Sequence, residues 1–435
     1  MLPRIRLALP LLFLLNVRGE PGRDPGEVLE RARTSLRGMT ERLSNYACIE
    51  TVERSYYEPV PLPEAASCAA QPAHGQGSGN LRLRGTDRLR LEVTVAGGHE
   101  IHAWPGATRF DTRDVDQIIQ QGPIGTGAFG THLIGVFDNP AVDFQLVGEK
   151  ADGSRTVIEY RYHVSAQASR YRVKIGTKWQ TVPYEGTFWL DPEAATLRRF
   201  TVEAGPLPQP AGVCSLKSAL DYQIVKIGDG ELLLPRQGEL RIVMDSANQT
   251  NNVTTFSDCR EYMTESAVHF DIGSETNSAA AKPMVRAPVA LPIGLPIVLS
   301  LTGAVDTGTA AAGDPVSAKV VQPVRRPGTS EVLIPSGAIV QGRITRLERH
   351  LLPQPYFLIA MSFNRLVRGE VSSPFAAKYD SNAELAHRLG AELRSRARGL
   401  EFWDVGTFLF PSSKPNFVLP AGYESKWATL ATPSR

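Results

Sequence analysis

An alternation of apolar and polar residues at every second position runs through most of the chain and limits its fold more than any other feature. It is clear in the segments CIETVERSYY, LRLRGTDRLRLEVTV, HEIHAW and TVIEYRYHV. Successive side chains of a strand point to opposite faces, so this period predicts strands with one buried and one solvated face. Turn residues between neighbouring runs indicate hairpins, and hairpins build antiparallel sheets. We therefore expect a mainly β protein.

One amphipathic helix is expected before these strands. Residues 24–46 place apolar side chains at steps of three and four, with charged residues between them; the apolar set is Val28, Ala32, Leu36, Met39, Leu43 and Tyr46. The expected fold class is thus α+β, with a helix that caps a curved antiparallel sheet. We assign residues 24–271 to this domain, and a chain of 435 residues has room for a second one.

The composition changes after residue 271. Residues 272–288 contain few large apolar side chains and are predicted to be a linker. Residues 289–425 contain apolar runs interrupted by Pro and Gly, which predict a small β-barrel domain. Within it, residues 382–397 place Leu385, Leu389 and Leu393 on one stripe and are expected to form a helix.

The first 19 residues have the composition of a secretory signal peptide. A short basic region precedes the apolar run LALPLLFLL, and small residues follow it. The alternative is a buried N-terminal helix. No later stretch approaches ~20 apolar residues without a charge, which is the length that a membrane-spanning helix needs. We expect a periplasmic or secreted protein.

Four cysteines fit an oxidising compartment. Cys48, Cys68, Cys214 and Cys259 show no C-x-x-C spacing and no nearby histidine cluster, so disulfides are favoured over a metal or redox site. Of the three possible pairings we favour Cys48–Cys68 with Cys214–Cys259, because each closes a local loop. Four unpaired buried thiols are the alternative.

The stretch GPIGTGAFG, residues 122–130, has the glycine spacing of a dinucleotide-binding loop. That spacing binds a pyrophosphate only where a buried strand enters the loop and a crossover helix leaves it. Here the polar segment DVDQIIQQ precedes the loop, and THLIGVF is too short for a crossover helix before Asp138-Asn-Pro140. We predict a flexible loop that opens a short helix capping the sheet, with no nucleotide and no cofactor.

Residues 186–205, GTFWLDPEAATLRRFTVEAG, contain a strand, a turn at Asp191-Pro192 and a return strand. A helix followed by antiparallel strands, with this W-L-D-P turn and the arginines after it, resembles the periplasmic lipoprotein carrier and sorting proteins and the related anti-sigma regulators. The resemblance covers about residues 26–270. It implies a curved sheet that holds an apolar groove closed by helices.

The C-terminal part repeats one turn tetrapeptide, at residues 291–294 (LPIG), 334–337 (IPSG) and 419–422 (LPAG). Together with the neighbouring strand VQGRITRLE it resembles the C-terminal β-barrel of conjugation and type IV secretion channel proteins, over about residues 289–370. The chain departs from that family because it lacks the N-terminal membrane span and the proline-rich arm.

No catalytic constellation is visible in the sequence. The motifs G-x-S-x-G, H-E-x-x-H and S-x-x-K are absent, and the eight histidines are scattered. His99 and His102 lie three apart in a predicted strand, so their side chains should point to opposite faces and not share a metal. A net charge of +2 gives no indication of nucleic-acid binding. We predict a protein that is not an enzyme and has no metal.

Two functions remain open. In the first, the N-terminal sheet binds an acyl chain, another apolar ligand or a lipoprotein, and the groove wall contains Tyr160, Tyr162, Phe188 and Phe200. The alternative for these four aromatic residues is a plain core. In the second function, the protein is a scaffold or assembly component of an envelope or secretion complex, and an exposed strand edge of its barrel docks onto partners.

Overall fold

The computed structural model describes residues 24–61, 67–68, 80–107, 110, 114–119, 122–175, 178–205, 207, 212–228, 230–261, 291–369, 371–379 and 406–431. The predicted signal peptide at 1–19, the linker at 272–288 and the helix at 382–397 lie outside these residues. The described part is dominated by antiparallel strands, which confirms the mainly β prediction.

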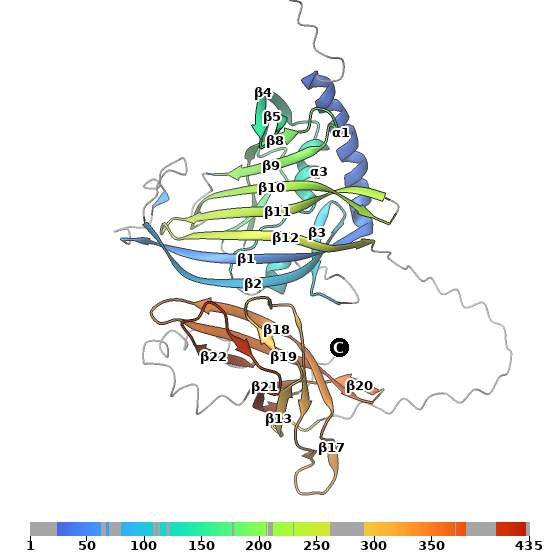
Figure 1. The fold of residues 1–435 in the computed structure, drawn as a ribbon, viewed down its shortest axis with the longest axis vertical. Coiled ribbons are helices and arrows are strands. Elements are labelled where there is room, and N and C mark those ends of the chain that lie inside the picture. Colours follow the sequence, from blue (N-terminus) through green and yellow to red (C-terminus); the bar gives the residue numbers. More distant parts are fainter. Residues whose placement is uncertain are drawn as a thin grey trace, which may run out of the picture.

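Ten strands of the N-terminal part form one antiparallel sheet in the order β4-β5-β8-β9-β10-β11-β12-β1-β2-β3 (Figure 1). The elements of this part are α1 (Pro25–Arg42), η1 (Leu43–Asn45), β1 (Tyr46–Val60), β2 (Asn80–Ala96), β3 (His99–Ala103), α2 (Val115–Ile118), α3 (Thr131–Phe137), β4 (Asp143–Asp152), β5 (Arg155–Val164), β6 (Arg172–Ile175), β7 (Lys178–Thr181), β8 (Tyr184–Leu190), β9 (Leu197–Ala204), β10 (Val213–Ile227), β11 (Gly230–Met244) and β12 (Gln249–Glu261). Strands β6 and β7 form a separate two-stranded hairpin.

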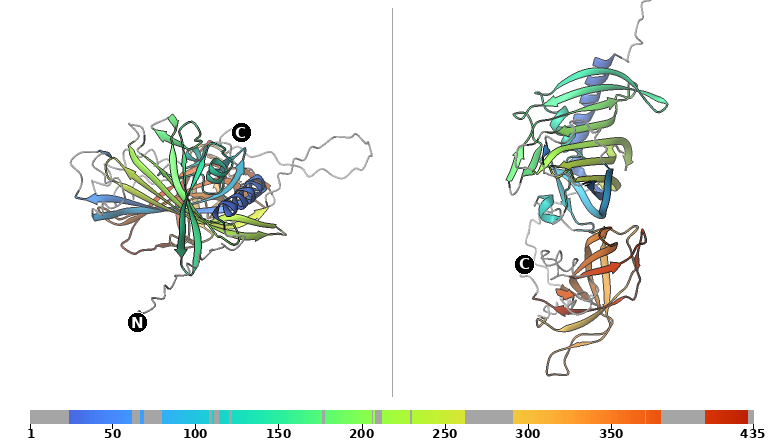
Figure 2. Two further views of the ribbon diagram at one scale, coloured as in Figure 1. Left: turned by 90° about the horizontal axis from the view of Figure 1, so that it is seen from above. Right: turned by 90° about the vertical axis from the view of Figure 1, so that its left-hand side faces the viewer.

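The predicted N-terminal helix is α1. Asp24 caps it, since its Oδ1 accepts hydrogen bonds from the backbone N–H groups of Gly26 and Glu27 at 2.9 and 3.1 Å. Its buried residues recur at steps of four: Val28, Ala32, Leu36 and Thr40. The sheet curves around α1 and α3 (Figure 2), and side chains of both helices share one core with strands β5 and β8 to β11. The helix-capped sheet is therefore confirmed.

A second antiparallel array follows in the C-terminal part, with the pairing order β21-β24-β13-β15-β18-β19-β22. Its strands are β13 (Pro296–Leu301), β14 (Val305–Asp306), β15 (Pro315–Val320), β16 (Val324–Arg325), β17 (Val332–Ile334), β18 (Ile339–His350), β19 (Tyr356–Arg368), β20 (Val371–Pro374), β21 (Ala377–Tyr379), β22 (Thr407–Pro411), β23 (Val418–Leu419) and β24 (Glu424–Thr429). It has its own apolar core around Trp427 and Phe363. Its closure into a barrel stays a prediction.

Strand β2 joins the two parts. On the side away from β1, its residues 85–87 pair with β18 and its residues 92–96 pair with β3. Between them, the N–H of Arg90 donates to Ala312 O at 2.7 Å, and the N–H of Ala312 donates to Arg88 O at 2.9 Å. The outer edge of β2 is thus covered by three segments in succession, and the C-terminal part lies directly against it (Figure 1).

Side chains reinforce this junction. Arg88 Nη1 donates to Gly308 O at 2.8 Å, and Arg90 forms an ion pair with Asp314. The backbones approach so closely that a Cβ at Gly313, whose φ is +109°, would lie 2.1 Å from Arg90 O. Only glycine fits this position.

Both disulfides are present, but the favoured pairing was wrong. Cys48 is bonded to Cys259 and Cys68 to Cys214, with sequence separations of 211 and 146 residues. The local-loop argument failed because strand order decides the pairing. Strand β12 returns to lie beside β1, which brings Cys259 to Cys48 across two neighbouring strands.

Peptide mapping tests the new pairing. Digestion without reduction should release one peptide pair that contains Cys48 and Cys259 and another that contains Cys68 and Cys214. Mass spectrometry before and after reduction identifies both pairs. A pair that links Cys48 to Cys68 would contradict the strand order described here.

Candidate functional site

Backbone N–H groups of the glycine loop, residues 122–130, bind the side-chain carboxylate of Glu100 on β3. The N–H of Gly127 donates to Glu100 Oε2 at 2.6 Å, and the N–H of Gly130 donates to Glu100 Oε1 at 3.0 Å. Each oxygen of the Glu100 side chain therefore has one backbone donor. Burial raises the pKa of Glu100, whereas His102 and these two hydrogen bonds oppose that rise.

Other strands hold the same loop over the concave face of the sheet. Pro123 O accepts hydrogen bonds from Asn252 Nδ2 on β12 at 3.1 Å and from Arg54 Nη1 on β1 at 3.4 Å. Ala128 O accepts one from the Tyr222 hydroxyl on β10 at 3.2 Å. Together with Glu100 on β3, four strands fix the loop, so it is an anchored element of the sheet's concave side, whereas the sequence suggested a flexible one.

A buried ion pair supports the start of the loop. Arg54 donates to both carboxylate oxygens of Asp87, at 2.6 and 2.8 Å, and the Tyr56 hydroxyl donates to Asp87 at 2.8 Å. Burial raises the pKa of Asp87, while Arg54 and Tyr56 act against that shift. A Cβ at Gly122 would lie 2.3 Å from the Tyr56 hydroxyl, so the loop backbone rests directly on this group.

An apolar pocket of about 590 Å³ lies on one side of the loop. On the sheet it is lined by Val213 and Leu216 of β10 and by Leu240, Ile242 and Met244 of β11. Ile119, Ile124 and Trp179 add further apolar lining from outside these two strands. Polar side chains, among them Arg84, Lys174 and Asn248, also contribute to its lining.

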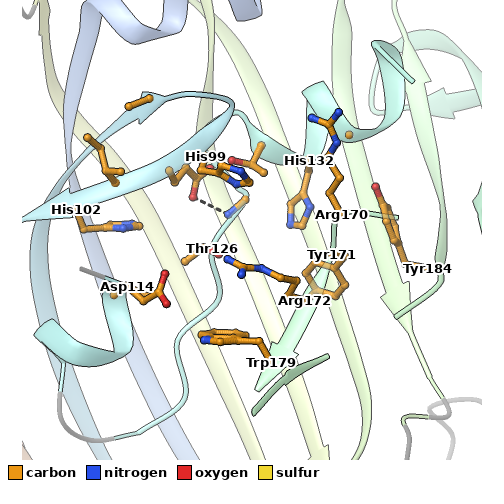
Figure 3. Close-up of a pocket in the computed structure, with 17 residues that line it drawn as sticks. His99, His102, Asp114, Thr126, His132, Arg170, Tyr171, Arg172, Trp179 and Tyr184 are labelled. Carbon is orange, nitrogen blue, oxygen red and sulfur yellow. Dashed lines mark hydrogen bonds between the residues drawn. The ribbon is translucent and has the colours of Figure 1, made fainter. Parts of the chain in front are cut away.

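A smaller, polar pocket of about 340 Å³ adjoins it (Figure 3). Its lining includes His99, Glu100 and His102 of β3, His132 of α3, and Arg170 and Arg172 at the start of the β6–β7 hairpin. Thr126, Tyr171, Arg172 and Trp179 line both pockets. The two pockets are therefore neighbours that share one wall.

The histidines of the polar pocket differ in their environments. His102 is buried on β3, with its Nε2 3.2 Å from Glu50 Oε2. Burial lowers the pKa of His102, but Glu50 and Glu100 raise it, and the net direction is upward. His132 is buried against Tyr171 and Phe200, and burial alone lowers its pKa to about 4. His99 is exposed, although it lines the same pocket as the buried His102.

The four aromatic residues predicted for the groove wall lie together in the core. Tyr160, Tyr162, Phe188 and Phe200 are at most 2% exposed. Tyr160 stacks on Phe188 and Tyr162 on Phe200, with ring centroids 5.1 and 5.2 Å apart. They form a layer behind the polar pocket, where Phe200 stacks on His132 and Tyr162 contacts Tyr184. Their role as ligand contacts stays a prediction.

Sequence reasoning missed the residues that shape the pockets. Leu240 and Ile242 lie in a predicted strand. The alternation of apolar and polar residues could not show that the helices leave part of the sheet face beside them uncovered. For Glu100 the sequence shows a carboxylate in a predicted strand and, separately, a glycine-rich loop whose N–H groups can bind an anion, but nothing in it shows that the two meet. Within the described residues, no group of three or more His, Cys, Asp or Glu is arranged to hold a metal ion.

The comparison with solved structures gives distant likenesses. No family model and no curated protein matches the sequence. Similar solved structures include one described as an outer membrane lipoprotein-sorting protein domain from Vibrio parahaemolyticus, with 11% identity over 54% of this chain and 92% of that chain and a TM-score of 0.26. Another is a DUF1329 family protein from Desulfovibrio piger, with 11% identity, coverages of 57% and 95%, and a TM-score of 0.24. TM-scores this low carry no argument about function.

Replacing Gly127 by alanine should destabilise the loop. Gly127 has a φ of +109°, and an added Cβ would lie 2.5 Å from His132 Nε2. We expect the free energy of unfolding of Gly127→Ala to fall by about 1 to 3 kcal/mol. Gly38→Ala is the control, since an added Cβ on α1 meets nothing within 4 Å and should raise stability by up to about 1 kcal/mol. Equal stability of Gly127→Ala and wild type in urea denaturation would refute this role of the loop.

His132 should make the protein less stable in acid. Its pKa is about 4 in the folded protein and 6.5 ordinarily, so between these values the unfolded chain takes up a proton that the folded chain does not. Stability is thus lost as the pH falls from 6.5 towards 4, by roughly 3 kcal/mol from this residue. His132→Phe should lose less stability than wild type over that range in thermal unfolding, whereas His99→Phe, at an exposed position, should behave as wild type. An unchanged pH dependence in His132→Phe would contradict the assignment.

Proposed function

We propose that the chain is a non-enzymatic protein of the cell envelope that binds an apolar ligand, such as an acyl chain or an acylated protein, on the concave face of its N-terminal sheet. One observation supports this most directly. The apolar pocket of about 590 Å³ is lined on the sheet side by five aliphatic or thioether side chains of β10 and β11. Its volume lies within the ~300–1,000 Å³ range of pockets that hold small molecules.

The pocket exists because the helices cover only part of the concave face. Side chains of α1 and α3 pack on β5 and β8 to β11 in the main core. Val213, Leu240 and Met244 lie at the border of that core and are only half-buried. Half-buried apolar side chains favour binding of an apolar ligand, because the ligand removes their remaining surface from water.

Binding accounts for the neighbouring titratable groups better than catalysis does. Glu100 is held by two N–H groups of the glycine loop, and His102 lies beside Glu50. These contacts give both side chains structural roles. An extracytoplasmic location is supported by the two disulfides, because such bonds persist in oxidising compartments. No described helix has the length and apolar character that crossing a membrane would require.

The scaffold alternative depends on an exposed strand edge in the C-terminal part. The strands that end the pairing order of this part are β21 and β22. We favour ligand binding because the apolar pocket is a specific observation for it, whereas no observation identifies a partner for these edges.

Matched leucine substitutions test this function. Titration calorimetry with 1-decanol should show binding to the wild-type protein. Leu240→Glu should weaken it at least tenfold, because a carboxylate in an apolar pocket must stay solvated or become protonated. Leu146→Glu is the control, since Leu146 lies 54% exposed on β4 and lines neither pocket.

A second variant separates loss of the pocket from loss of the fold. Leu240 packs against Gly125 of the glycine loop, whereas Met244 lines the same pocket near the end of β11. Met244→Glu should therefore weaken decanol binding with little effect on the thermal unfolding temperature. No binding by wild type, or equal binding by all variants, would refute the proposed function.

A further inference from the structure

The β6–β7 hairpin presents two arginines to the polar pocket. Arg170 and Arg172 lie two residues apart, both line this pocket, and both are exposed (Figure 3). Neither forms an ion pair with a described residue, whereas Lys174, two residues further on, is paired with Asp116. The hairpin therefore supplies two cationic groups whose charge the described protein does not neutralise.

Trp179 positions one of these arginines at the junction of the two pockets. The guanidinium of Arg172 lies 5.3 Å from the centroid of the Trp179 ring, a cation–π contact that holds it over the ring face. Arg172 and Trp179 line both the polar and the apolar pocket. A ligand that fills the apolar pocket and extends past Trp179 would reach Arg172 first.

The anionic side chains of the polar pocket do not cancel this charge. Glu100 already accepts two hydrogen bonds from the glycine loop. Asp114 is exposed and lies on the side towards which Arg172 extends in Figure 3, but it forms no ion pair with Arg170 or Arg172. The charged side chains of the polar pocket that neither accept loop hydrogen bonds nor form an ion pair with a described residue are therefore two cations, Arg170 and Arg172, and one anion, Asp114.

We infer that the ligand is an amphiphile with an anionic head, such as a carboxylate or a phosphate ester. Its chain lies in the apolar pocket, and its head is bound by Arg170 and Arg172. This inference rests on the proposed function. Guanidinium groups present fixed N–H donors that match the oxygens of such heads. The shared wall of the two pockets allows one molecule to occupy both.

Three ligands of equal chain length test the head. In calorimetry, decyl phosphate should bind the wild-type protein at least tenfold more tightly than 1-decanol, and decyltrimethylammonium should bind less tightly than either. The double variant Arg170→Gln/Arg172→Gln should bind decyl phosphate about tenfold more weakly, so that its preference for decyl phosphate over 1-decanol is lost. Arg155→Gln is the control, because this exposed arginine of β5 lines neither pocket.

The possible results separate this inference from the function on which it rests. Equal affinity for decyl phosphate and 1-decanol, or a decyl phosphate affinity that the double variant leaves unchanged, would overturn the anionic head and leave the apolar pocket as a binding site. Inorganic phosphate that binds as tightly as decyl phosphate would identify a free-phosphate site and overturn the amphiphile. Failure of all three decyl ligands to bind would refute the proposed function itself.

Discussion

The contact between the Glu100 carboxylate and the N–H groups of Gly127 and Gly130 organises the concave side of the N-terminal sheet. It fixes the end of the glycine loop, and the hydrogen bonds to Pro123 O fix its start. Between these points Thr126 stands at the wall that the two pockets share. The shape of the whole site therefore depends on a loop held by an internal anion. Two of the donors that a bound phosphate would need in such a loop are engaged by the protein itself.

The sequence predicted those parts of the fold that depend on local pattern. The alternation of apolar and polar residues predicted the strands, and apolar residues at steps of three and four predicted α1. The short segment THLIGVF was predicted to be a helix, and it forms α3. Long-range partners were beyond this reasoning. The pairing of Cys48 with Cys259 follows from the return of β12 to β1, and no spacing in the sequence encodes that strand order.

The candidate site shows the same division between local and long-range information. Alternation indicated correctly that Tyr160, Tyr162, Phe188 and Phe200 face inwards, but it could not distinguish a filled interior from an open one. That difference depends on how far α1 and α3 extend over the sheet. It also depends on the β6–β7 hairpin, which pairs with no other described strand. Side chains hold the hairpin over the pockets, since Val173 packs in the main core and Lys174 is paired with Asp116.

Strand β2 belongs to both parts of the molecule, since its residues 85–87 pair with β18 while its other side pairs with β1 along its length. Separating the two parts would therefore break backbone hydrogen bonds of β2 as well as the ion pair between Arg90 and Asp314. The junction is built like the interior of a β-sheet and not like a linker between two domains.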